Sequence, residues 1–108
     1  MKKEDIVEND VNNIEIVMNE IKDLLIQKNR AYGSSFRSSG ALAEACGATP
    51  MMGLFVRLED KMKRITNLLQ NPNISIGDES VEQTILDLVG YWVLALILVR
   101  EGDKRGEE

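Results

Sequence analysis

The segment ILDLVGYWVLALILV, residues 85–99, contains a single charged residue, Asp87. On a helix its apolar side chains occupy two faces. One face holds Val81, Ile85, Leu88, Trp92 and Leu96, and a second holds Leu86, Leu94 and Leu98. A helix that is apolar nearly all round is buried nearly all round. Its fifteen residues, interrupted by Asp87, are fewer than the roughly 20 that a membrane span needs. We therefore expect a helix that other helices cover.

Two further long helices are predicted before this segment. The first spans about residues 12–28, and its apolar side chains recur at spacings of three and four: Ile14, Val17, Ile21, Leu24 and Leu25. The second begins at Thr49, a suitable N-cap, and at Pro50, which suits the first helical position. Its expected core stripe is Leu54, Leu58, Met62, Ile65 and Leu69. Asn71 and Pro72 end it, because proline cannot continue the hydrogen-bond ladder.

The third helix is predicted to begin at Asp78 or Ser80 and to run to about Arg100, with Ser80 and Gln83 spaced as a capping box. A short helical turn is expected in ALAEAC, residues 41–46. The predicted fold is all-α: three long helices plus a loop with a short helix. We expect a polar tail over residues 1–11, one helical domain over 12–100 and a charged tail over 101–108. Because two helices hardly cover the third, a homodimer or higher homo-oligomer should complete the bundle.

The amino-acid composition limits the ligands and the catalytic mechanisms that this chain can have. Thirteen Lys and Arg against eighteen Asp and Glu give a net charge of −5, which disfavours direct nucleic-acid binding or attraction to an anionic membrane. An anionic ligand therefore needs a local basic cluster. The absence of His and the single Cys46 exclude zinc hydrolases and Ser-His-Asp or Cys-His catalysis. The start, MKKEDIVEND, lacks the apolar stretch of a signal peptide, so we expect a cytoplasmic protein.

Asp87 is the first candidate site residue, because an unpaired charge on a buried helix is costly. Glu79, Gln83 and Asp87 are four residues apart and form one polar stripe, with Glu82 on a neighbouring line. Two interpretations stay open. Inward-pointing carboxylates on facing helices hold hard cations such as Mg²⁺ or Mn²⁺. Alternatively, Asp87 pairs with an Arg or Lys, and the other acids cap the helix start.

The second candidate lies in RLEDKMKRI, residues 57–65. Arg57, Lys61 and Arg64 fall at i, i+4 and i+7 with Asp60 among them, so one helix edge carries three cations and a carboxylate. Such an edge can bind a triphosphate, and Asp60 can orient it or share a metal. The alternative is a solvated flank with weak i,i+4 pairs. Lys61 lies close to the Leu58 and Ile65 stripe, which favours the first interpretation.

The third candidate is the loop KNRAYGSSF, residues 28–36, followed by Arg37. Its Gly and Ser residues offer backbone N–H and hydroxyl donors to phosphate or ribose, and Tyr32 or Phe36 can stack on a base. We expect Lys28 and Arg37 to contact phosphates and Tyr32, Ser34 and Phe36 to contact base or sugar. The alternative is a Gly-Ser turn anchored by two aromatic side chains.

With these blocks assembled, the chain resembles the family called nucleotide modification associated domain 1, found mainly in phages and bacteria. Three blocks carry the resemblance: KNRAYGSSF, LFVRLEDKMKRITNLL and DESVEQTILDLVGYWVLAL, within about residues 15–98. The family is similar to the all-α NTP pyrophosphohydrolases that include MazG and dimeric dUTPases. The resemblance implies a MazG-like helical bundle that uses acidic side chains on two helices to bind Mg²⁺ and releases pyrophosphate from a nucleoside triphosphate.

The resemblance also assigns residues. Asp60 and Lys61 match the family's Asp-Lys pair, Arg64 its following Arg, and Glu79 and Asp87 its acids on the third helix. If the protein is such an enzyme, the expected catalytic residues are Asp60 and Asp87, and the expected metal ligands are Glu59, Asp60, Glu79, Glu82 and Asp87. The chain departs from the pattern at Gln83, where the family usually has Asp, and in lacking the full EExxE of MazG on the second helix. Fewer anionic ligands weaken Mg²⁺ binding.

The sequence therefore leaves two main functions open. One is a Mg²⁺- or Mn²⁺-dependent pyrophosphohydrolase in nucleotide or modified-nucleotide metabolism. The other is an oligomer that sequesters a nucleotide, such as a cyclic signalling nucleotide, without cleaving it. The second needs the basic and aromatic residues but no intact acid cluster, which suits Gln83. A structural or regulatory helical partner with no small ligand is a third alternative.

Overall fold

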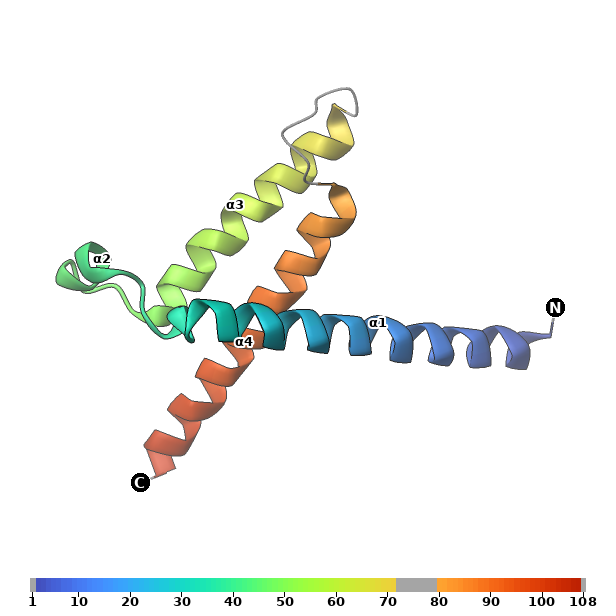
Figure 1. Ribbon diagram of the computed structural model, residues 1–108, viewed down its shortest axis with the longest axis horizontal. Helices are drawn as coiled ribbons and strands as arrows, with labels where there is room; N and C mark the ends of the chain where they lie inside the picture. Colours follow the sequence, from blue (N-terminus) through green and yellow to red (C-terminus); the bar gives the residue numbers. More distant parts are fainter. Residues whose placement is uncertain (1, 72–79, 108) are drawn as a thin grey trace. The chain divides into compact units, whose positions relative to one another are not determined.

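The computed structural model describes residues 2–71 and 80–107, and of residues 103–107 it describes the backbone alone. The helices of the described residues, labelled in Figure 1, are α1 (Lys3–Tyr32), α2 (Ala41–Ala45), α3 (Pro50–Gln70) and α4 (Val81–Glu107). A 3₁₀ turn, η1, spans Ser35–Arg37. No strand occurs in the described part of the chain, which confirms the all-α prediction. The chain divides into two compact units, residues 1–34 and residues 35–108.

Helix α1 begins well before the predicted position. The expected polar tail is helical from Lys3 onward, and Glu4 and Asp5 lie in the first turn, where negative charge interacts favourably with the helix dipole. The helix ends at Gly33, whose φ of 58° is the left-handed conformation that glycine adopts readily.

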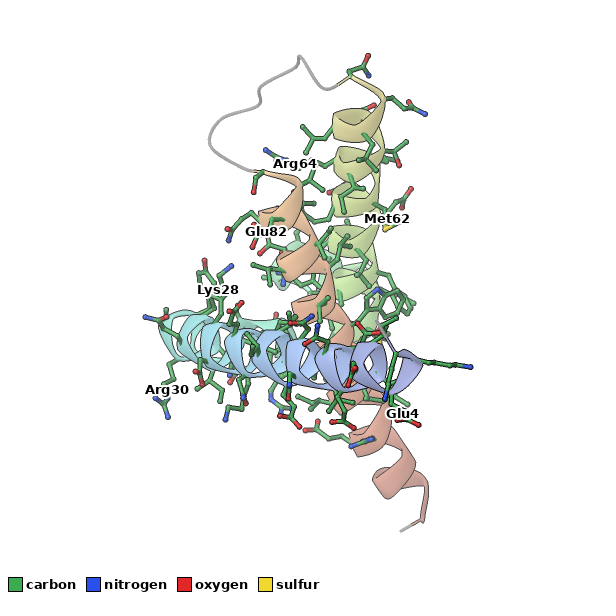
Figure 2. The ribbon with its side chains drawn as sticks, turned by 90° about the vertical axis from the view of Figure 1, so that its right-hand side faces the viewer. Glu4, Lys28, Arg30, Met62, Arg64 and Glu82 are labelled. Atoms are coloured by element: carbon green, nitrogen blue, oxygen red, sulfur yellow. The ribbon has the colours of Figure 1, made fainter. Side chains whose placement is uncertain are left out.

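Helices α3 and α4 form an antiparallel hairpin, which Figures 1 and 2 both show side by side. Two contacts give its register. Phe55 meets Trp92, whereas Lys61, six residues later on α3, meets Asp87, five residues earlier on α4. The buried residues of this hairpin and its 3₁₀ turn are Phe36, Leu54, Leu58, Thr84, Leu88, Gly90 and Ala95.

The buried faces differ from the predicted stripes by a rotation of each helix. On α3, Met62 and Leu69 are exposed, and Lys61 lies nearer the contact with α4. On α4, Ile85, Trp92 and Leu96 are exposed, whereas Thr84 and Ala95 are buried. Small side chains let two helices approach closely, and a choice of face by hydrophobicity alone overlooks them.

The predicted starts of α3 and α4 are confirmed. Thr49 Oγ1 accepts a hydrogen bond of 3.2 Å from the backbone N–H of Met52, and Pro50 occupies the first turn. Ser80 Oγ accepts one of 3.1 Å from the N–H of Gln83. These bonds satisfy N–H groups that have no partner within the helix.

Helix α4 is longer than the fifteen-residue segment considered from sequence. Over Val81–Gly102 it is long and apolar enough to cross a membrane, judged by length and composition only, with a mean hydropathy of 1.6. Only 22% of its apolar stretch is buried within the structure. The expectation of no membrane span concerned the charged, fifteen-residue segment 85–99 alone, which lies within this longer helix, and it stays a prediction.

Candidate functional site

An ion pair joins the two helices of the hairpin at the position where the sequence predicted a buried carboxylate. Lys61 Nζ lies 3.1 Å from Asp87 Oδ2, and the two side chains are 21% and 17% exposed. Of the two interpretations of Asp87, the structure thus shows pairing with a cation of the preceding helix. The pair lies largely out of solvent, where charges interact more strongly than at an open surface.

Three of the four cations of α3 share one edge of the helix. At about 100° per residue, Arg57, Lys61 and Arg64 fall within about 60° of one another. Arg57 is exposed, and Arg64 is half-buried. Figure 2 shows Arg64 on the side of α3 next to the first turn of α4, with Met62 on the other side of α3. The cationic edge, Arg57, Lys61 and Arg64, therefore runs along the hairpin with Asp87 beside its centre.

The predicted metal ligands do not gather around Asp87 in the described residues. Glu59 pairs with Lys63 at 3.3 Å and lies about 160° around α3 from Lys61. Glu82 lies about 140° around α4 from Asp87, and Gln83 is the polar side chain one turn before it.

Asp60 is exposed on the outer side of the cationic edge, and Glu79 falls outside the described residues. Among the residues that are described, no group of three or more His, Cys, Asp or Glu is placed to hold a metal ion. The described acids alone do not fit a metal centre.

The loop residues have separate environments. Phe36 is buried against Leu54 and Ala95, so it anchors the turn, and its ring is covered rather than open to a base. Tyr32 is exposed at the end of α1, and Ser34 Oγ accepts a hydrogen bond of 3.0 Å from Asn29 Nδ2. Lys28 is half-buried on α1. These three expected contacts belong to the first unit, whereas the cationic edge belongs to the second.

Arg37, an expected phosphate contact, is held by a carboxylate of α4. Its two terminal nitrogens donate hydrogen bonds of 2.7 and 2.8 Å to the two carboxylate oxygens of Glu101. These hydrogen bonds raise the pKa of the Arg37 guanidinium above its ordinary value. Glu101 is not among the predicted site residues, because it falls in the predicted charged tail, residues 101–108. The continued helix α4 brings it opposite η1.

The sequence of the hairpin and the preceding loop decides the relationship to known proteins. Residues 28–99, two thirds of the chain, match the family described as nucleotide modification associated domain 1. The chain belongs to this family. The match covers the loop, α3, the cationic edge and Asp87, so every part of the candidate site lies within the family domain. Searches of curated proteins and of solved structures each found no match.

Proposed function

We propose that this protein of the nucleotide modification associated domain 1 family binds a nucleotide by its phosphates along the cationic edge of α3. The observation that carries the proposal is the largely buried pair of Lys61 and Asp87. A helical hairpin with only a structural role is served as well or better by apolar side chains at such a position, because charges lose solvation on burial. A functional role gives a reason to retain the pair.

The chemistry of the edge suits a phosphate chain. An ammonium has three N–H donors, and a guanidinium has five in a planar fork, so both types of side chain bind phosphate oxygens. Helix geometry spaces Arg57, Lys61 and Arg64 over about 10 Å, at 1.5 Å per residue. Binding of phosphate at Lys61 weakens its hold on Asp87, which then favours another positive partner.

Hydrolysis is the form of this activity that the resemblance to MazG-like enzymes implies. In that proposal Mg²⁺ or Mn²⁺ is the cofactor, and the products are a nucleoside monophosphate and pyrophosphate. A specific observation favours sequestration instead: Gln83 stands one turn before Asp87, and the described acids do not form a metal-binding group. Cytoplasmic location is proposed with either function.

The test is a panel of nucleoside and deoxynucleoside triphosphates with Mg²⁺, read by pyrophosphate release and by melting temperature. Hydrolysis predicts that Asp87→Asn abolishes release, and that Asp23→Asn, at an exposed acid of α1 that is not among the predicted metal ligands, retains it. Sequestration predicts a raised melting temperature without release; at a ligand concentration of 100 Kd the stabilisation is about 2.7 kcal/mol. Absence of any effect of nucleotide on melting contradicts both functions.

A further inference from the structure

The α3–α4 hairpin carries a continuous apolar face on the side away from the cationic edge. Its side chains share an exposure of about one half. They are Phe55 49%, Met62 52%, Ile85 48%, Trp92 56%, Leu96 49% and Val99 47%. We call these six residues the Phe55–Trp92 face.

Both helices contribute to one surface. The rings of Phe55 and Trp92 lie 6.2 Å apart in an edge-on arrangement across the two helices. Seven residues are two helical turns, so Met62 lies on the same side of α3 as Phe55, and Ile85 on the same side of α4 as Trp92. Because the helices are antiparallel, Met62 and Ile85 fall beside each other. The face therefore extends along the hairpin from Val99 to Met62.

The exposed area is large enough to support association. Large apolar side chains bury on the order of 150–250 Å² each, so six half-exposed ones leave roughly 600 Å² for a partner. Two such faces give roughly 1,200 Å², which reaches the lower limit of stable protein interfaces. A contiguous exposed apolar area of this size on a small domain marks an interaction surface.

Charge at the edge of the face identifies the partner. Glu59 and Lys63 form an exposed ion pair with side chains 68% and 70% exposed, and Glu59 lies between Phe55 and Met62 along α3. In a two-fold interface each contact occurs twice, with the two residues exchanged between the copies, so Glu59 of one copy can face Lys63 of the other while Lys63 of the first faces Glu59 of the second. A bilayer gives these two charges no such partners and makes their burial costly.

We propose that two copies of this chain associate through the Phe55–Trp92 face to form a four-helix bundle. The face gives a specific location to the homo-oligomer expected from the sequence. Trp92 lies about 140° around α4 from Asp87, so this interface leaves the cationic edge uncovered. The proposal stands independently of nucleotide binding.

The test uses the full chain and its single tryptophan, Trp92. Sedimentation equilibrium measures mass over a range of concentrations, and the emission maximum and acrylamide quenching of Trp92 are followed on dilution. We expect a dimer in which Trp92 emission is blue-shifted and protected, with both signals lost as the dimer dissociates. Leu96→Glu should shift the protein to monomer. The control Leu42→Glu, at a leucine of α2 that is 84% exposed outside the face, should remain dimeric.

Three results overturn the proposal. A wild-type monomer at high concentration shows that no second copy covers the face. An oligomer in which Trp92 stays freely quenched places the interface elsewhere, and this measurement does not depend on a variant folding. Binding to lipid vesicles with protection of Trp92, in a protein that is monomeric without lipid, identifies a membrane as the partner. Circular dichroism of Leu96→Glu verifies that loss of the dimer is not loss of the helices.

Discussion

Lys61 occupies a position in the α3–α4 contact that an apolar side chain could fill. Leu58 and Ile65 lie three and four residues away on the same side of α3, and Leu54 and Leu68 lie seven residues away, two turns along the helix. The ammonium of Lys61 meets Asp87 at this contact. With side chains 21% and 17% exposed, the pair is neither a surface salt bridge of small effect nor a fully buried one. Its main consequence for stability is that each side chain depends on the other, because removal of one charge takes the ion-pair partner from the other.

A double-mutant cycle measures that dependence. We expect Lys61→Met and Asp87→Leu each to lower the free energy of unfolding by about 1–3 kcal/mol, less than for a fully buried pair. The double variant should recover to near the wild-type value, because it leaves no uncompensated charge. Urea unfolding followed by circular dichroism gives the four free energies. Additive effects of the two substitutions argue against an energetic coupling.

Phe36 and Tyr32 have different roles, although the sequence offers both as ring contacts for a base. Phe36 is 5% exposed against Leu54 and Ala95, whereas Tyr32 is 67% exposed. Phe36→Ala should therefore lower the free energy of unfolding by about 3–5 kcal/mol, and Tyr32→Ala by less than about 0.5 kcal/mol. Thermal and urea unfolding measure both free energies. Comparable decreases in the free energy of unfolding of the two variants would contradict the different roles of Phe36 and Tyr32.

The starts of α3 and α4 can be predicted from the sequence because they depend on nearby residues. The buried faces of these helices are harder to predict because they depend on packing between helices. Thr49, Pro50 and Ser80 act through bonds within a few residues, so the sequence predicts them. The face of α4 that meets α3 depends on Thr84 and Ala95, whose advantage is small size and appears only when a second helix is present. Hydrophobicity alone favoured Ile85 and Trp92, which the hairpin leaves exposed.

Two threonines of α3 offer opposite tests of this local chemistry. Thr49 caps the helix, so Thr49→Ala should lower the free energy of unfolding by about 1 kcal/mol. Thr66 is exposed within the helix and donates to the backbone carbonyl of Met62 at 3.0 Å. Thr66→Ala should be neutral or stabilising by up to about 0.7 kcal/mol, because alanine is the better helix former. Equal effects of the two substitutions in urea unfolding contradict the capping role.

The candidate site can be predicted only in part from the sequence, because some of its contacts join residues that are far apart along the chain. Spacing along one helix predicts that Arg57, Lys61 and Arg64 share an edge, and the cost of a lone charge predicts a cation at Asp87. The position of Arg37 depends on Glu101, which lies far away in sequence and beyond the predicted end of the helix. Such a long-range contact follows from the length and register of α4, which no local pattern reports.

The family domain, residues 28–99, contains a hairpin that has two sides with different chemistry. One side carries the cationic edge and Asp87, and the other carries the Phe55–Trp92 face. Helix α1 and the residues Lys28, Tyr32 and Ser34 belong to the other compact unit. The central proposal, nucleotide binding at the cationic edge, is therefore tested best by a change confined to that edge.

Isothermal titration of nucleoside triphosphates into Lys61→Met and Lys63→Met provides that test. Both variants lose one lysine of α3, but Lys61 pairs with Asp87 at the edge, whereas Lys63 pairs with Glu59 elsewhere on the helix. Loss of a phosphate contact predicts at least a tenfold weaker affinity for Lys61→Met, about 1.4 kcal/mol, with wild-type affinity for Lys63→Met. Equal affinities of the two folded variants would contradict nucleotide binding at the cationic edge.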